Sequence, residues 1–85
     1  MKDAWEALAD KTRREILGLL KGRPHTAGEI ADQFALSNST VSHHLSVLKQ
    51  SGLIQSQKRA QTIIYSLNTT VFQGVMKTVS DFLKK

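Results

Sequence analysis

Apolar residues recur at spacings of three and four through the first half of the chain, which predicts a series of short amphipathic helices. Asp10 can accept a hydrogen bond from a free amide of the helical turn that follows it, and Gly22 ends the apolar repeat. The pattern therefore predicts one helix over residues 1–9 and a second over residues 11–21.

Two further helices are predicted between Thr26 and Gly52. Thr26 and Glu29 have the spacing of a capping box, in which each side chain satisfies an amide at the start of a helix. Ser37 is a second N-cap, and Gly52 suits the left-handed backbone position that ends a helix. Two short helices joined by about three or four residues predict a helix-turn-helix over residues 26–52.

After this motif the apolar period changes to two, which is typical of strands. Residues 53–67 are rich in β-branched and aromatic side chains and contain a polar tip, so they predict a β-hairpin, the wing. We expect the strand face that carries Ile63, Tyr65 and Leu67 to meet the core.

A last helix over residues 69–84 completes one domain, residues 1–85. The expected order is helix-helix-helix-helix-strand-strand-helix, which is a mainly α fold with a small β-hairpin (α+β) and the architecture of a winged helix-turn-helix. The apolar stripe of the last helix is wider than the core of so short a chain needs, which predicts a dimer surface with the first helix. The alternative is that the last helix folds onto its own core. The predicted interface residues are Trp5, Leu8, Val71, Phe72, Val75, Val79 and Phe82.

The helix predicted after Ser37 has two different faces. Val41, Leu45 and Leu48 form one apolar line, whereas the opposite face carries short polar side chains and no carboxylate. Such groups donate and accept hydrogen bonds, as base edges do in a DNA major groove, which is about 12 Å wide and admits one helix. The alternative is that the first of these polar residues only cap the helix. The predicted base-reading residues are Asn38, Ser39, Thr40, Ser42, His43 and Ser46.

The net charge of +5 is unevenly distributed. Residues 33–80 contain no Asp or Glu, so positive potential collects on the half of the chain that carries the polar helix. This distribution is expected for a protein that binds double-stranded DNA. Cations at a hairpin tip alternatively serve to block edge-to-edge pairing of strands. The predicted contacts to the DNA backbone are Lys49, Lys58, Arg59 and Gln61.

Several classes of protein are disfavoured by the composition. The chain has no cysteine, which leaves no disulfide framework or thiolate metal site. No apolar run approaches the about 18 residues of a membrane span, and no signal peptide is recognisable, so we expect a cytoplasmic protein without membrane insertion. No catalytic triad, phosphate-binding glycine loop or pair of buried carboxylates can be assembled, and we expect neither an enzyme nor a cofactor.

Four segments carry a resemblance to a known family: DKTRREIL at 10–17, STVSHHL at 39–45, LK at 48–49 and GLI at 52–54. With the predicted order of elements, they resemble the winged helix-turn-helix repressors of the ArsR/SmtB type over nearly the whole chain. SHHL, LKQ and YSLNTT are most similar to the SdpR-like autorepressors within that family. The resemblance implies a repressor or autorepressor, with the positions of Asn38, Ser39, Ser42 and His43 facing DNA. Since one short reading helix spans few base pairs, we expect a homodimer on a palindromic operator. The alternative function is a winged-helix module for protein–protein contacts.

The metal sites of that family are not expected here. Metal-sensing members place Cys pairs in the third helix, or His and acidic ligands in the last, where this chain offers only Asp81. His43 and His44 are adjacent and point about 100° apart on a helix, so they cannot chelate one ion, and His25 is expected alone in a turn. We also expect Arg13 and Arg14 to be solvated. The releasing signal is then a protein partner, a small molecule or simple autoregulation.

Overall fold

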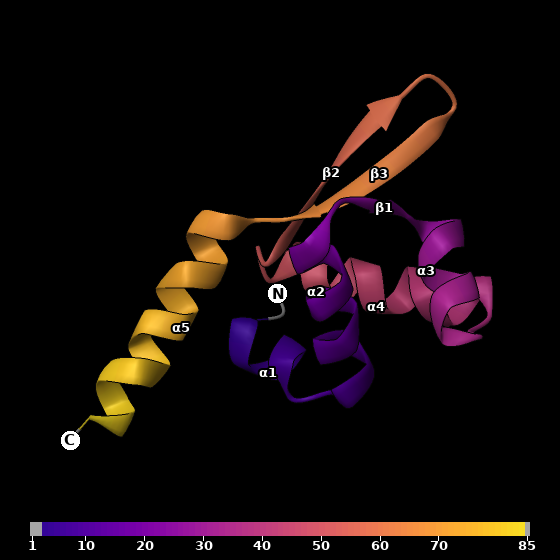
Figure 1. Ribbon diagram of the computed structural model, residues 1–85. Helices are drawn as coiled ribbons and strands as arrows, with labels where there is room; N and C mark the ends of the chain where they lie inside the picture. The colour runs from indigo at the N-terminus through magenta and orange to yellow at the C-terminus, as the bar shows by residue number, and fades with distance from the viewer. Residues whose placement is uncertain (1–2, 85) are drawn as a thin grey trace.

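The computed structural model describes residues 3–84, and its order of elements confirms the predicted mainly helical winged fold (Figure 1). The helix predicted over residues 1–9 is shorter, and Met1 and Lys2 lie outside the described residues. The elements in chain order are α1 (Ala4–Leu8), α2 (Lys11–Gly22), β1 (His25–Thr26), α3 (Ala27–Phe34), α4 (Asn38–Gln50), β2 (Ile54–Arg59), β3 (Thr62–Leu67) and α5 (Thr69–Leu83).

The caps predicted for the helix-turn-helix are confirmed. The Thr26 hydroxyl accepts a hydrogen bond from the Glu29 amide at 3.1 Å, and the Glu29 carboxylate accepts one from the Thr26 amide at 2.9 Å. The Ser37 hydroxyl accepts from the Thr40 amide at 3.2 Å, and Gly52 has a φ of 83° just beyond α4. These groups set where α3 and α4 begin and where α4 ends.

The sheet has three strands in the order β1-β3-β2, whereas the sequence predicted only the hairpin. In β1, His25 pairs with Tyr65 and Thr26 pairs with Ile64 of β3. A strand of two residues is too short to show an alternating pattern, which is why it was not predicted. The placement of His25 in a turn was therefore wrong: its side chain is 7% exposed, and its Nδ1–H donates to the carbonyl of Arg23 at 2.8 Å.

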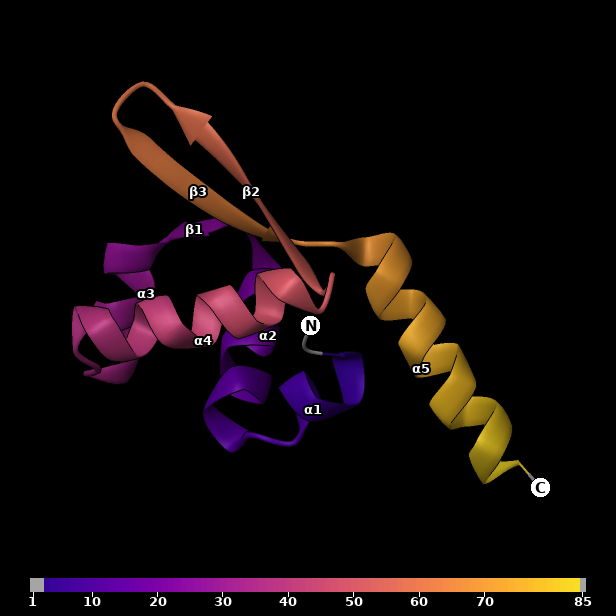
Figure 2. The same ribbon diagram turned by 180° about the vertical axis from the view of Figure 1, so that it is seen from behind.

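The wing projects from the body, and its tip stands clear of the helices (Figures 1 and 2). Tyr65 and Leu67 pack against the core as expected, but Ile63 is 47% exposed because it lies on the projecting part of the hairpin. The turn is formed by Ala60 and Gln61, between the paired residues Arg59 and Thr62 of β2 and β3. Ala60 has a φ of 54°, a left-handed conformation that glycine adopts more easily.

The core lies between α2, α3, α4 and the base of the hairpin. Its largest fully buried side chains are Ile16, Ile30, Val41, Leu48 and Leu53. Helix α5 contains no buried residue and extends away from the body in both views (Figures 1 and 2). The described part of the molecule is therefore elongated, with extents of 46 × 26 × 23 Å.

Candidate DNA-binding surface

Helix α4 separates its apolar and polar residues as its sequence pattern predicts. Val41, Leu45 and Leu48 are buried at 0%, 3% and 0% exposure, and Val47 joins them in the core. Helix α4 lies at the outside of the body in Figure 2, and the residues of its opposite face are exposed. All six predicted base-reading residues are exposed on this face: Asn38, Ser39, Thr40, Ser42, His43 and Ser46.

Some of these side chains already have partners within the chain, and others do not. Thr40 Oγ1 accepts a hydrogen bond from the Ser37 hydroxyl at 2.8 Å, and Ser46 accepts one from Gln50 Nε2 at 3.3 Å. Within the part of the chain that the structure describes, Asn38 and Ser42 make no side-chain hydrogen bond. Their donors and acceptors are thus available to an external partner.

The predicted backbone contacts are also exposed, but two of them belong to a strand. Lys58 and Arg59 are the last residues of β2, and only Gln61 lies in the hairpin turn. Lys49 lies in the last turn of α4. None of these three cations takes part in an ion pair among residues 3–84. Their charges are therefore free to neutralise phosphates rather than carboxylates of the same chain.

The expectation that Arg13 and Arg14 are solvated was wrong for Arg13, which is half-buried, whereas Arg14 is exposed as expected but also binds a backbone carbonyl. Arg14 Nη1 donates to the carbonyl oxygen of Leu8 at 2.7 Å. Arg13 Nε donates to the carbonyl of Ala7 at 2.9 Å, and its Nη2 donates to the carbonyl of Glu6 at 3.3 Å. These carbonyls lie in the last turn of α1, where a helix leaves its acceptors without intrahelical partners. Both arginines therefore close the end of α1.

Arg13 also reaches α4, where its Nη1 lies 3.3 Å from Nδ1 of His44. The His44 side chain is 12% exposed, and Asp10 Oδ2, which belongs to the N-cap of α2, lies 4.0 Å from the same nitrogen. Burial lowers the pKa of His44 below 6.5, Asp10 opposes this change, and the positive charge of Arg13 and the neighbouring His43 add to it. The amide of Arg13, which donates to the Asp10 carboxylate, lowers the pKa of that carboxyl group.

The predicted dimer surface is partly exposed and partly packed on its own subunit. Trp5 and Phe82 are 54% and 74% exposed, whereas Val71, Phe72 and Val75 are half-buried against the core. Leu8 and Val79 are also half-buried. Two apolar residues outside the predicted set, Met76 and Leu83, are exposed on α5 as well.

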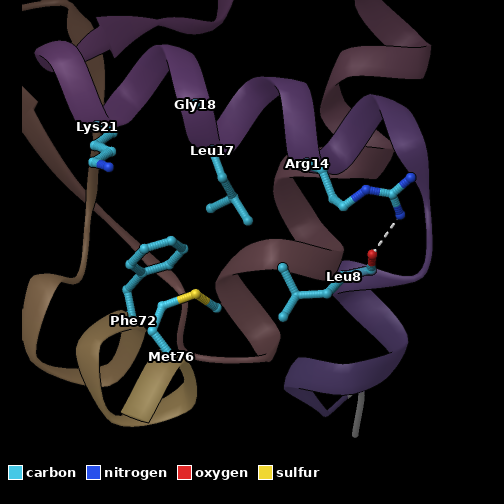
Figure 3. Close-up of a pocket in the computed structure, with 7 residues that line it drawn as sticks. All are labelled: Leu8, Arg14, Leu17, Gly18, Lys21, Phe72 and Met76. Carbon is cyan, nitrogen blue, oxygen red and sulfur yellow. Dashed lines mark hydrogen bonds between the residues drawn. The ribbon is translucent and has the colours of Figure 1, made fainter. Parts of the chain in front are cut away.

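An apolar cavity of about 250 Å³ lies between α1, α2 and α5 (Figure 3). Leu17 of α2 points into it, toward Leu8 on one side and toward Phe72 and Met76 on the other. Arg14, held by the carbonyl of Leu8, and Lys21 lie at its ends, and Gly18 completes the lining. Because Leu8 and Phe72 belong to the predicted dimer surface, the cavity continues that surface inward.

The described residues offer neither a metal cluster nor a membrane-spanning helix. In residues 3–84 no group of three or more His, Cys, Asp and Glu side chains lies close enough together to hold a metal ion. No helix of that same stretch is long and apolar enough to cross a membrane.

Three features define a winged-helix DNA-binding protein: a helix-turn-helix packed on the core, an exposed polar face on its second helix, and a projecting hairpin whose cations form no ion pair among residues 3–84. Similarity to known proteins supports this class. A family model described as a helix-turn-helix domain matches residues 8–57. The transcriptional repressor SdpR of Bacillus subtilis (strain 168) is 46% identical over 85 residues, which cover 100% of this chain and 94% of the relative.

Two more similarities extend this result. The transcriptional activator HlyU of Vibrio cholerae serotype O1 is 33% identical over 72 residues, which cover 85% of this chain and 67% of the relative. A crystal structure of an ArsR family transcriptional regulator superposes with a TM-score of 0.82 at 29% identity, covering 94% of this chain and 88% of that one. The chain belongs to the helix-turn-helix family of ArsR/SmtB-type transcriptional regulators, which are not enzymes.

Sequence reasoning missed the residues that hold the reading helix from behind. Arg13 and Arg14 were visible only as exposed cations, because their partners are backbone carbonyls and, for His44, a side chain 31 positions away. The adjacent pair His43 and His44 held a usable signal. One of two neighbouring residues on an amphipathic helix often turns toward the body, and the inward one needs a polar partner.

Proposed function

We propose that this DNA-binding transcriptional repressor acts as a homodimer on a palindromic operator, with α4 of each subunit in a major groove. The observation that carries the proposal is the two-sided character of α4, whose buried line is apolar and whose exposed face is polar and free of carboxylates. Asn38, Ser42 and His43 supply the free donors and acceptors that read bases. Ser39, Thr40 and Ser46 complete the face.

The wing and the end of α4 bind the DNA backbone in this proposal. Lys58, Arg59 and Gln61 extend from the body on the hairpin, and Lys49 lies on the last turn of α4. Cations that form no ion pair within residues 3–84 attract phosphates and hold the reading helix in register without selecting a sequence. Binding to DNA places the protein in the cytoplasm.

Two subunits are needed because one reading helix covers too little DNA. Helix α4 has 13 residues and is therefore about 20 Å long, which allows contact with only a few base pairs. A two-fold axis would put two such helices into successive major grooves about 34 Å apart. The surface that would form the dimer comprises Trp5, Leu8, Val71, Phe72, Val75, Val79 and Phe82.

Footprinting on the DNA upstream of the protein's own coding region tests this function. The expected result is protection of two half-sites related by a dyad, with centres about ten base pairs apart. Protection of a single asymmetric segment would contradict the homodimeric arrangement. The other candidate function is a winged-helix module that binds proteins. If it is correct, the protein should bind all sequences of a random pool of DNA duplexes equally weakly. The unpaired cations Lys49, Lys58 and Arg59 favour DNA over that candidate.

A further inference from the structure

The guanidinium group of Arg13 joins three helices. Arg13 lies in the first turn of α2. Its Nη2 donates to the carbonyl of Glu6 and its Nε to the carbonyl of Ala7, both in α1. Its remaining nitrogen, Nη1, lies 3.3 Å from Nδ1 of His44 in α4. A guanidinium is planar and carries its donors in a rigid fork, so the two bonds to α1 determine where the third donor points.

His44 receives this donor from the inner side of α4. Its side chain is 12% exposed, whereas His43, the next residue toward the start of the helix, is exposed. Because an arginine can only donate, Nδ1 must accept, which requires a neutral ring with its proton on Nε2. Burial lowers the pKa of His44, which favours this neutral form at neutral pH. The charged and titratable groups around the ring are Asp10 at the N-cap of α2, Arg13 of α2 and His43 of α4 itself.

Two kinds of contact restrain the rotation of α4. Val41, Leu45 and Leu48 keep one face of the helix toward the core by burial, and the contact of His44 with Arg13 adds a restraint that depends on direction. A roll of the helix about its axis would move Ser42 and His43 sideways across the groove. Binding groups must be held to within about 0.5 Å, and directed hydrogen bonds from a supporting residue provide that precision.

We propose that Arg13 is a positioning residue, which fixes the rotation of α4 relative to α1 through His44 and so places the base-reading side chains. The inference rests on the proposed function of α4. Arg13 also links the proposed dimer surface to the reading helix, because α1 contributes Trp5 and Leu8 to that surface. A displacement of α1 in the dimer is then passed to the reading helix by one side chain.

Arg14 offers a matched control. It is the neighbouring residue on α2, carries the same charge and also binds the end of α1, through the carbonyl of Leu8, but no hydrogen bond or ion pair joins it to α4 among the described residues. Arg13→Gln and Arg14→Gln therefore remove equal charge, and they remove two hydrogen bonds to α1 and one, respectively. Only Arg13→Gln also removes the contact with α4.

The first measurement compares affinities for two duplexes. One is the sequence that the unaltered protein selects from a random duplex pool, and the other is a scrambled duplex of equal length and composition. Arg13→Gln should lower the ratio of the two affinities about tenfold, the size of one lost base contact, while Arg14→Gln leaves the ratio unchanged. Arg13→Lys should lose the ratio as well, because an ammonium group lacks the fork. Equal ratios for Arg13→Gln and Arg14→Gln, or full retention by Arg13→Lys, would overturn the proposal.

Substitutions of His44 test the same contact from α4 and keep the bonds of Arg13 to α1. His44→Asn can place an amide oxygen near the position of Nδ1, and should retain the affinity ratio. His44→Leu introduces an apolar side chain that can stay buried but cannot accept a hydrogen bond. This variant should lose the affinity ratio. If His44→Leu discriminates the two duplexes as well as His44→Asn does, the contact does not position α4.

Amide hydrogen exchange on the free protein separates this inference from the proposed function. Arg13→Gln should accelerate exchange in both α1 and α4, whereas Arg14→Gln should accelerate exchange in α1 alone. If the unaltered protein shows no sequence preference, the proposed function fails. The exchange pattern then still shows whether Arg13 links α1 to α4. Protection of α4 that is identical in the two variants contradicts the link.

Discussion

Ser42 and His43 occupy the middle of the exposed face of α4, and their backbones are held by an element whose other face is fully packed. Ser42 has no side-chain hydrogen bond within residues 3–84, and the His43 ring only borders that of His44, with 5.8 Å between ring centroids. Because both side chains point away from the core, their removal should weaken DNA binding without disturbing the fold.

We therefore predict that Ser42→Ala and His43→Ala each weaken binding to the selected duplex by about 1–3 kcal/mol per lost base contact. Gel-shift titration measures the loss, and circular dichroism should show unchanged helix content. Ser80→Ala, an exposed hydroxyl on α5, is the matched control and should bind normally. Wild-type affinity of both α4 variants would remove these residues from the reading face.

The buried ring of His44 also makes stability depend on pH. Its pKa is lowered in the folded protein, so the unfolded chain binds more protons than the folded chain as pH falls through 6.5. The stability contributed by the neutral ring is present above 6.5 and is lost below it.

For this reason the unaltered protein should lose stability between about pH 7.5 and about pH 5.5, and His44→Asn should lose less. Urea denaturation at both pH values gives the two differences. His25 and His43 are present in both proteins, so their effects cancel in the comparison. A loss of the same size in both proteins would show that His44 does not contribute.

At the scale of the elements, local signals predicted most of what positions the site. The capping pairs Thr26 with Glu29 and Ser37 with Thr40 lie three residues apart, so both could be read from the sequence. Strand β1 could not, because two residues become a strand only when β3 lies beside them. The inward role of Arg13 depends likewise on a residue of another helix. Local chemistry predicts where an element starts, and packing decides which side chains support it.

The connection between α3 and α4 contains a strained residue that was not predicted. Ala35 ends α3 with φ 53° and ψ 43°, the left-handed conformation in which a Cβ is unfavourable. Ala35→Gly should therefore raise the free energy of unfolding by about 1 kcal/mol. Urea denaturation measures it. Ala9→Gly is the control, because Ala9 ends α1 with a φ of −69°, where glycine gives no relief. Equal effects of the two substitutions would contradict the explanation.

The wing is the second element for which a prediction is specific. Lys58 and Arg59 lie at the end of β2 and have no carboxylate partner in the part of the chain that the structure describes. They therefore suit phosphates, whose recognition carries no sequence information. Replacing both by Gln should weaken binding to the selected and the scrambled duplex by similar factors. The slope of log affinity against log salt should flatten by about 0.9 for each lost contact. Loss confined to the selected duplex would instead identify the wing as a base reader.

On the scale of the whole molecule, the exposed apolar residues of α5 have no role in the core of a single subunit. The first half of α5 packs Val71 and Val75 against the core, while its second half extends away with Phe82 and Leu83 at 74% and 75% exposure. Large apolar side chains that gather on an unpacked helix mark an interaction surface. A second copy is the occupant that the proposed palindromic operator would require.

Phe82→Asp is therefore expected to give a folded monomer that binds the selected duplex weakly. In a dimer the substitution would bury an unpaired carboxylate at the contact, whereas in a single subunit position 82 is exposed and tolerates the charge. Sedimentation measures the association and circular dichroism the helix content. Gln73→Asp introduces the same charge on an exposed position of α5 away from the apolar stripe, and should remain dimeric. A dimeric Phe82→Asp protein would place the interface elsewhere. An unfolded one would assign this end of α5 to the core of its own subunit.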